Sequence, residues 1–520
     1  MLKSSYEVEL TPFDLSVFEA FVPADHFLRR LKAAIDFAPF RSLVADCYSP
    51  DQGRGANDPV CLLKFLLLQF HYGLSDENVV RQSQVNLAFR FFLDLSAQSR
   101  LPEPSLLSQF RTRLGAQRFA KIFQEIVRQA RAAGLIKDRL RLKDATHLIA
   151  NIAVPTTLRL VAQTREQLLA AAESFASDEV AAHRQAALEV RQATSDLKDE
   201  ARLLRRVEHL RELIIWGAEW QERLEIGAPP VTNEVYDAFV SSLSTARKVL
   251  GDREPEKKSQ PKDKLLSLTD TDARRSKHGE YYDGYLLDVM IDADSDLICG
   301  LDVLAANADE AANAKNLIES EEAAHGNDIE SLSIDGIGFN GVVLKALSDD
   351  EDGPQLTVFV PPKPDWSATP NLYQPEDFKL NEAGDEVTCP NGETTKTRYR
   401  DGKDHGWVYQ FKTSQCEACP LRANCVKPQK RAARKVSKND FQAQYKAAKQ
   451  RATTNEYKEI RKKHPAIERK LNELVRWHDG RRVRYRGRQR VKVQYLLLGI
   501  VVNCKRIVRL LTAAPAAQPA

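Results

Sequence analysis

The sequence lacks any apolar run of the ~18 residues that a membrane-spanning helix requires. Its densest apolar cluster, residues 65–68, is soon interrupted by Gln69 and His71. Residues 1–10 also lack the basic stretch and apolar core of a secretory signal. We therefore expect no membrane partner and a cytoplasmic protein. Its eight cysteines would stay reduced there and serve as core residues, metal ligands or nucleophiles.

Acidic residues are scarce in the C-terminal part of the chain. From Val426 to the end there are 6 acidic and 26 basic residues, whereas the preceding part carries 66 acidic and 50 basic ones. The net charge of +4 therefore hides an acidic body joined to a basic segment. An ordinary solvated surface would distribute the charge more evenly. The asymmetry instead favours a polyanionic partner, and we expect that partner to be nucleic acid.

Glycine and proline are absent from the 61 residues between Thr156 and Trp216. This stretch is rich in Ala, Leu, Glu and Arg, which predicts long solvent-exposed helices, most simply a coiled hairpin. A chain of 520 residues exceeds a single hydrophobic core, so it is expected to contain several domains or large insertions.

The remaining sequence has the pattern of an α/β protein. Residues 1 to about 130 carry apolar positions at helical spacing and predict a helical domain. Strand-like alternation begins at Arg139, and it returns with intervening helical patterns at 281–291, 297–304, 331–335 and 356–360. Helices that cover a mixed sheet would give an α/β domain.

Three carboxylates are candidates for metal chemistry. Asp144 lies on the first strand, Asp335 ends a later strand, and Glu468 lies on a late helix. Open sheets place their chemistry at strand ends. Together the three acids could hold two divalent ions, Mg²⁺ or Mn²⁺, ~3.5–4 Å apart for an in-line phosphoryl displacement. Each acid also has a structural reading, as a strand cap, a turn residue and a surface helix residue respectively.

A dense basic run follows Glu468. Nine Lys or Arg residues against two acids lie between Arg469 and Arg490. Guanidinium groups bind phosphates as forks, and Tyr485 could stack on a base exposed at a DNA end. The predicted DNA contacts here are Arg469, Lys470, Arg476, Arg481, Arg482, Arg484, Tyr485, Arg486, Arg488 and Arg490.

A short helix that begins at Pro104 adds two more candidates. Arg111 and Arg113 lie on its polar face, which suits contact with DNA edges or phosphates. An ordinary amphipathic surface helix would show the same pattern, so this element is weak evidence when taken alone.

Four cysteines have the spacing of a structural metal site. Cys389, Cys416, Cys419 and Cys425 follow the pattern C-x26-C-x2-C-x5-C. Four thiolates in a reduced compartment predict a tetrahedral Zn²⁺ site with a scaffolding role. The alternative is a redox pair with two core cysteines, and His405 or His464 could replace one ligand.

Several short sequence motifs resemble those of DDE transposases of bacterial insertion sequences, from a branch that carries a cysteine-rich zinc insert. They are Leu142-Lys143-Asp144-Ala145-Thr146-His147, Thr269-Asp270-Thr271-Asp272-Ala273-Arg274, Ser333-Ile334-Asp335-Gly336, Ile467-Glu468-Arg469-Lys470, Arg484-Tyr485-Arg486-Gly487, Asn503-Cys504-Lys505-Arg506 and, near the N-terminus, Phe110-Arg111-Thr112-Arg113-Leu114. The resemblance covers most of the chain apart from 160–264. It implies a ribonuclease H-like domain in which Asp144, Asp335 and Glu468 bind the metals.

The chain departs from the family pattern around two of these acids. The family often has Tyr and Arg ahead of the Glu and Lys seven residues after it, where this chain has Arg461, His464 and Val475. Tyr457 and Arg476 lie near enough to substitute. The Tyr that often follows the second acid is absent, and Gly338-Phe339 stands there instead.

The resemblance implies a transposase that cuts and joins double-stranded DNA at the terminal inverted repeats of its element and at target DNA. It also implies association with the nucleoid and a homo-oligomer on DNA. The alternatives are a catalytically silent DNA-binding regulator and a nuclease that does not rejoin strands. The expected segments are a helical DNA-binding domain (1–130), the first catalytic strand (131–159), a helical coiled insertion and linker (160–264), the continued catalytic domain (265–362), a zinc-ribbon-like insertion (363–440), C-terminal catalytic helices (441–512) and a flexible tail (513–520).

Overall fold

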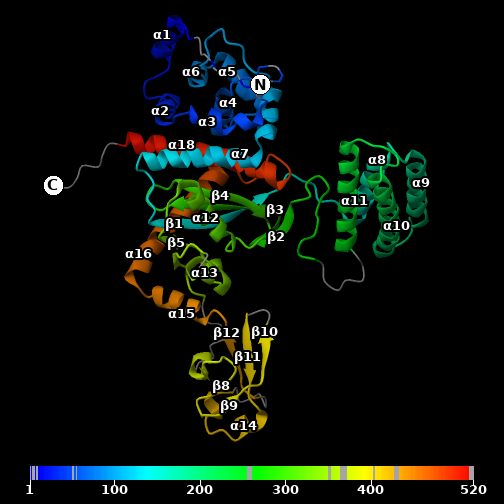
Figure 1. Cartoon of the computed structure of the whole chain (residues 1–520), viewed down its shortest axis with the longest axis vertical. Coiled ribbons are helices and arrows are strands. Elements are labelled where there is room, and N and C mark those ends of the chain that lie inside the picture. Colours follow the sequence, from blue (N-terminus) through cyan, green and yellow to red (C-terminus); the bar gives the residue numbers. More distant parts are fainter. Residues whose placement is uncertain are drawn as a thin grey trace, which may run out of the picture.

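The computed structural model describes residues 2, 6, 10–49, 52–53, 55–253, 261–349, 353–363, 372–401, 405–426 and 433–513. Residues 514–520 of the predicted tail and residues 254–260 of the predicted linker lie outside these ranges. In Figure 1 the N-terminal helices form one end of the molecule, a small β module forms the other, and the mixed sheet lies between them. A helical bundle stands to one side of the sheet.

The N-terminal region is helical, as the apolar spacing predicts. Its helices are α1 (Pro12–Phe21), α2 (Phe27–Ala34), α3 (Pro39–Leu43), α4 (Pro59–Tyr72), α5 (Asp76–Val85), α6 (Leu87–Leu93) and α7 (Pro104–Ala132). α4 is buried on nearly every side because it forms the centre of this layer. Asp58 caps its first turn, and Gly73 ends it with the positive φ that glycine adopts without strain.

The sheet is mixed. Its strands are β1 (Leu140–Ile149), β2 (Arg274–His278), β3 (Glu280–Asp292), β4 (Ile298–Ala305), β5 (Ser331–Ser333) and β6 (Thr357–Phe359). β3 runs antiparallel to β1, and β4 runs antiparallel to β3 on its other edge. β2 pairs with the first part of that same edge. β5 runs parallel to β1, and β6 runs parallel to β5.

Two basic side chains of β1 are buried beneath a helix. α12 (Asn313–His325) covers this face together with α13 (Gly341–Ser348), which packs on β6. Arg141 is fully buried and pairs with Glu321 of α12 and Asp292 of β3. Lys143 pairs with Asp288, 3.0 Å away. The charged side chains on this face of β1 therefore form buried ion pairs, and β1 is covered on both faces.

The long helical stretch is a bundle of its own rather than the coiled hairpin expected from its sequence. Within 157–253, which is fully described, the chain forms α8 (Thr157–Ala172), α9 (Ser177–Ala193), α10 (Asp199–Glu225) and α11 (Asn233–Arg253). These helices share a hydrophobic core that includes Leu168, Leu213 and Phe239. Because this core is separate from that of the sheet, the bundle is an insertion with its own stability.

The C-terminal helices close the sheet. They are α15 (Gln442–Arg451), α16 (Asn455–Lys463), α17 (Pro465–Asn472), a π-helix (Glu473–Trp477) and α18 (Arg488–Thr512). α18 lies beside α7 between the sheet and the N-terminal helices, and nearly all of its middle is buried (Figure 1). None of the helices in the described ranges combines the length and apolarity that crossing a bilayer needs.

The small β module carries the cysteines. It contains the sheet β7 (Lys379–Leu380), β8 (Val387–Thr388) and β9 (Thr394–Thr395), and the sheet β10 (Arg398–Asp401), β11 (Gly406–Gln410) and β12 (Lys435–Asn439). A short helix, α14 (Thr413–Glu417), follows β11. Short 3-10 turns occur at Ala45–Cys47, Gly336–Gly338, Pro375–Asp377 and Arg422–Asn424.

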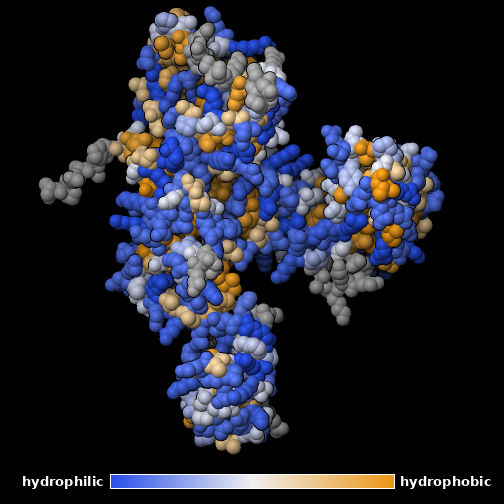
Figure 2. Space-filling model, in the orientation of Figure 1, coloured by the Kyte–Doolittle hydropathy of each residue, from blue (hydrophilic) through white to orange (hydrophobic). Residues whose placement is uncertain are grey.

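The visible surface is mostly hydrophilic. Figure 2 shows apolar patches over the N-terminal helices and on the bundle. On α1, Phe13 and Phe21 are about 70% exposed, at 71% and 69%. These are candidate contact surfaces that no described element covers.

Candidate metal and DNA site

Asp144 lies on β1, and Asp335 lies two residues beyond the end of the neighbouring strand β5. The parallel register of β1 and β5 pairs Leu142 with Ser333, so each aspartate follows a paired residue by two positions. Neighbouring strands are about 4.8 Å apart, and positions two apart share a face of the sheet. Asp335 ends its strand by accepting a hydrogen bond from the Ile337 N–H, at 3.2 Å. Asp335 can therefore cap the turn that follows β5 and still lie near Asp144.

Glu468 reaches the same place from α17. This helix packs against β1 and β3 through buried residues that include Ile467 and Leu471, and it leaves Glu468 exposed. Burial raises the pKa of Asp144 to about 6, and the negative charges of Asp335 and Glu468 add to that rise. The Ala145 N–H, which donates to Asp144 Oδ1 at 2.8 Å, opposes it. The three acids are therefore close enough to repel one another.

Arg461 and His464 hold the last helices against the end of β5. Arg461 Nη1 donates to Ser333 Oγ at 3.1 Å and to the Ile334 carbonyl at 2.9 Å. The His464 ring lies 3.1 Å from the same hydroxyl, Nδ1 to Oγ. Burial lowers the pKa of Arg461, but Asp335, Glu468 and Asp144 all oppose this effect. Burial also lowers the pKa of His464 to about 4, so its ring is neutral at pH 7.

Glu310 is a fourth carboxyl at this site that the sequence does not reveal. It lies in the loop between β4 and α12, and its carbonyl accepts a hydrogen bond from Lys143 Nζ at 2.6 Å. Burial raises the pKa of Glu310 to about 7, with Lys143 opposing and Asp335 and Asp144 contributing to the rise. It belongs to no motif, so only the fold shows where it lies.

The donor set suits a divalent cation by its chemistry. Carboxylate oxygens are the ligands that Mg²⁺ and Mn²⁺ prefer, and mutual repulsion of the acids would be relieved by a cation. Over the ranges that the structure describes, however, there is no group of three or more His, Cys, Asp or Glu side chains arranged to hold an ion. The acids are thus neighbours, without the closed geometry of a bound metal.

The four predicted zinc ligands surround one small cavity in the β module. Cys389, Cys416, Cys419 and Cys425 line it together with Phe378 and Phe411. Burial raises the pKa of Cys425, and the other three thiols add to that rise. The spacing therefore predicts their convergence correctly. Within the described ranges, these thiols do not have the arrangement of a metal-binding group.

Arg111 and Tyr485, both predicted DNA contacts, interact with each other inside the protein, and Arg111 also pairs with Asp76. Both oxygens of Asp76 accept hydrogen bonds from Arg111, at 2.8 and 2.6 Å, and its side chain is only 10% exposed. The guanidinium also lies over the Tyr485 ring, 5.4 Å from its centre. Arg111 and Tyr485 therefore join α7 to the loop that precedes α18, and both are partly buried there.

Three further basic residues are engaged inside the protein. Lys470 is buried and pairs with Glu473 at 2.8 Å, so its charge is already paired within the chain. Arg481 donates to Thr146 Oγ at 3.1 Å and to the His147 carbonyl. The Arg484 guanidinium lies over Phe70, 5.2 Å from the ring centre. These arginines fix the loop that follows the π-helix against β1 and α4.

The other predicted DNA contacts are on the surface. Arg486 donates to the Asn151 carbonyl at 3.0 Å but is otherwise exposed, and Arg113 lies over Tyr48. Exposed side chains with a predicted DNA role are Arg113, Arg469, Arg476, Arg482, Arg486, Arg488 and Arg490. The basic run 469–490 therefore contains two groups of residues. Lys470, Arg481 and Arg484 contact other parts of the protein, whereas the remaining arginines are exposed to solvent.

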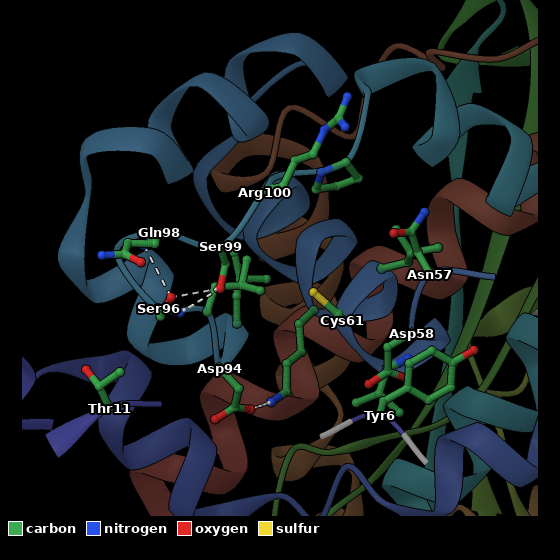
Figure 3. A pocket seen from close by; sticks show the side chains of 16 residues that line it. Tyr6, Thr11, Asn57, Asp58, Cys61, Asp94, Ser96, Gln98, Ser99 and Arg100 are labelled. Atoms are coloured by element: carbon green, nitrogen blue, oxygen red, sulfur yellow. Dashed lines mark hydrogen bonds and ion pairs between the residues drawn. The ribbon is translucent and has the colours of Figure 1, made fainter. Parts of the chain in front are cut away.

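A polar hollow in the N-terminal layer lies apart from the acids. It is lined by residues that include Asn57, Asp58, Ser99 and Arg100 (Figure 3). Lys64 and Asp94, which also line it, form an ion pair. α7 and α18 lie between this layer and the sheet (Figure 1). Its two carboxylates, Asp58 and Asp94, are each paired with a basic side chain, Arg41 and Lys64 respectively, unlike Asp144.

Two family models match the chain. A "Transposase domain (DUF772)" model matches residues 16–113, which include α2 to α6 and the start of α7. A "Transposase DDE domain" model matches residues 388–508, which include Glu468 and the cysteine cluster from Cys389 onward. No curated protein and no solved structure matches the chain.

Proposed function

We propose that this chain, which its two family matches identify as a DDE transposase of an insertion element, cleaves DNA strands at the ends of that element and transfers them to target DNA. The observation that supports the proposal is that Asp144 lies on β1 and Asp335 just beyond the end of the parallel strand β5, with the charges of Asp335 and Glu468 both raising the pKa of Asp144. Strand transfer requires this kind of site, because the same carboxylates must serve cleavage and joining.

A ribonuclease H-like fold for the catalytic domain is supported by the sheet. In the strand order β4-β3-β1-β5-β6, β3 is antiparallel to β1 and β4, and the last three strands are parallel, which puts Asp144 on a central strand and Asp335 just after the next one. Ligands bind at the carboxyl ends of central strands in open α/β sheets. The N-terminal helices and the bundle are additions to this catalytic unit.

Asp144, Asp335 and Glu468 would hold two divalent cations, Mg²⁺ or Mn²⁺. Cations bound there supply the Lewis-acid chemistry of phosphoryl transfer, which activates the attacking oxygen and stabilises the leaving one. The chain itself positions the DNA. Arg461 keeps α16 against β5, and the exposed Arg476 and Arg482 offer positive charge to the backbone. Glu310, with a pKa of about 7, can accept a proton near neutral pH.

The cysteine module would act as a scaffold. Four thiolates facing one cavity are the donor set of a structural Zn²⁺ site, and such a closed site has no position open for catalysis. We propose that zinc draws the four sulfurs together and stiffens the module. The helical domain at residues 1–130 would recognise the element ends, and the protein would act on double-stranded DNA as a homo-oligomer.

The test is a cleavage assay with labelled DNA from the ends of the element that carries this gene. Wild type with Mg²⁺ is expected to nick the end and to join it to a target duplex. Asp144→Asn is expected to bind the same DNA but to leave it intact. Binding by wild type without any metal-dependent cutting would instead indicate a silent DNA-binding regulator. Cutting without joining would indicate a nuclease.

A further inference from the structure

Trp477 is the most exposed of the large apolar side chains that the structure describes, at 82%. A single exposed apolar residue is ordinary on a protein surface, so exposure alone indicates nothing. Three further observations set this residue apart: its secondary structure, its neighbours and its distance from the acids.

The indole stands on a fixed element rather than on a loop tip. The π-helix Glu473–Trp477 continues α17 without a break, and Leu474 and Val475 within it are buried. α18 packs against this segment. π-helical turns are rare and occur frequently at functional sites. The ring is therefore held at the surface by packing beneath it.

The exposed side of this continuous helix carries polar and basic residues from Glu468 onward. Glu468, Arg469, Asn472, Arg476 and Trp477 face solvent, whereas the intervening apolar residues and Lys470 are buried. Arg469 and Arg476 have no carboxylate partner within the described part of the chain. A rise of 1.5 Å per residue puts Trp477 about 13 Å beyond Glu468 along the axis, which is a few nucleotides of DNA.

We propose that Trp477 stacks on an unpaired base of the DNA strand that the three acids act on. Duplex bases are covered by their neighbours, so an indole face reaches a base only where the strand is unpaired or ends. Arg469 and Arg476 would hold the adjoining phosphates. This inference rests on the proposed function and gives Trp477 the role expected from sequence for Tyr485, whose ring Arg111 covers.

The test compares two DNA probes in the presence of a metal chelator, so that no cutting occurs. One probe is a blunt duplex, and the other has the same sequence with a short single-stranded overhang. Trp477→Ala is expected to lower affinity for the overhang probe about tenfold, equivalent to about 1.4 kcal/mol, and to change affinity for the blunt probe by less than about twofold. Trp477→Phe is expected to retain most of the preference. The matched control is Ile226→Ala, a similarly exposed apolar residue, at 81%, which follows α10 in the helical bundle.

Equal losses on both probes, or an unchanged preference for the overhang, would overturn the inference. A 2-aminopurine base in the overhang gives a second readout, because stacking on Trp477 quenches its fluorescence. These outcomes do not depend on cleavage. A wild-type protein that fails to cut DNA but prefers the overhang through Trp477 would contradict the proposed function alone.

Discussion

The Arg461 guanidinium donates a hydrogen bond to the carbonyl oxygen of Ile334, with Nη1 and O 2.9 Å apart. Ile334 immediately precedes Asp335, and Arg461 lies seven residues before Glu468. One side chain thus joins the strand that carries the second acid to the helices that carry the third. This contact explains how acids 133 positions apart in sequence keep a fixed separation.

Removing this contact is expected to slow cleavage while leaving DNA binding intact. Arg461→Ala should lower the single-turnover cleavage rate with Mg²⁺ by about 10–100-fold, as is typical when a group that orients metal ligands is lost. Arg461→Lys should recover only part of the rate, because an ammonium group lacks the planar fork. The control is Lys462→Ala, an exposed neighbour paired with Glu459. Equal rates for Arg461→Ala and Lys462→Ala would contradict this role.

The charge of Asp144 is expected to destabilise the metal-free protein at neutral pH. Its folded pKa of about 6 lies above its ordinary value of 3.8, so the folded state binds the proton more tightly. Stability therefore falls as pH rises from about 4 to about 6, and the penalty is complete above that range. Asp144→Asn should be more stable than wild type at pH 7.5, by on the order of 1–2 kcal/mol, and nearly equal to it at pH 4.

Thermal melts at the two pH values measure this difference directly. Adding Mg²⁺ at pH 7.5 should raise the Tm of wild type, since a bound cation removes the repulsion, but should raise that of Asp144→Asn much less. A variant less stable than wild type at pH 7.5 would show that Asp144 is a structural residue and not a strained site carboxylate.

The exposed and internal halves of the basic segment should behave differently in salt. Arg476→Ala and Arg482→Ala are each expected to reduce the slope of log K against log salt by about 0.9, the value for one lost phosphate contact. Arg111→Ala should leave that slope unchanged and lower stability by about 1–2 kcal/mol, because partly buried Asp76 loses its cationic partner but keeps its hydrogen bond from Gln69. The measurements are DNA titrations at several salt concentrations and a urea melt. If Arg111→Ala changed the salt dependence of DNA binding and Arg476→Ala did not, Arg111 rather than Arg476 would be the residue that contacts phosphate.

Zinc should remain with the purified protein through the cysteine module. We expect about one Zn²⁺ per chain by elemental analysis, the number of ions that four thiolates hold. The double variant Cys416→Ser and Cys419→Ser should contain little. Cys47→Ser, a half-buried cysteine outside the module, should retain the metal. Wild-type protein free of zinc, with the module still folded, would show that the thiols simply pack together.

Much of the catalytic sheet can be predicted from sequence, because its signals are local. Alternation marks β1 around Asp144, and the Asp335-Gly336 pair marks the end of β5. The bundle is harder to predict. Apolar spacing tells which face of a helix is buried but not how many helices share the core. The stretch 156–216, expected to be a hairpin, instead forms α8, α9 and much of α10 of a four-helix bundle.

Side-chain partners account for most of the remaining differences. Arginine and lysine are usually exposed, so Arg111 and Lys470 look like DNA contacts until the fold brings Asp76 and Glu473 to them. Glu310 and Trp477 belong to no motif. Their significance depends on tertiary position, one beside the aspartates and the other at the end of a helix whose exposed side begins with Glu468.

The most direct measurement replaces Mg²⁺ with Fe²⁺ in the presence of ascorbate and peroxide, so that radicals formed at the bound iron cut the nearby polypeptide backbone. Three sets of fragments are expected, with ends near Asp144, Asp335 and Glu468. Excess Mg²⁺ should suppress all three, and Asp144→Asn should weaken all three together. Backbone cuts near only one of these residues, or cuts that Mg²⁺ does not suppress, would contradict a shared cation site.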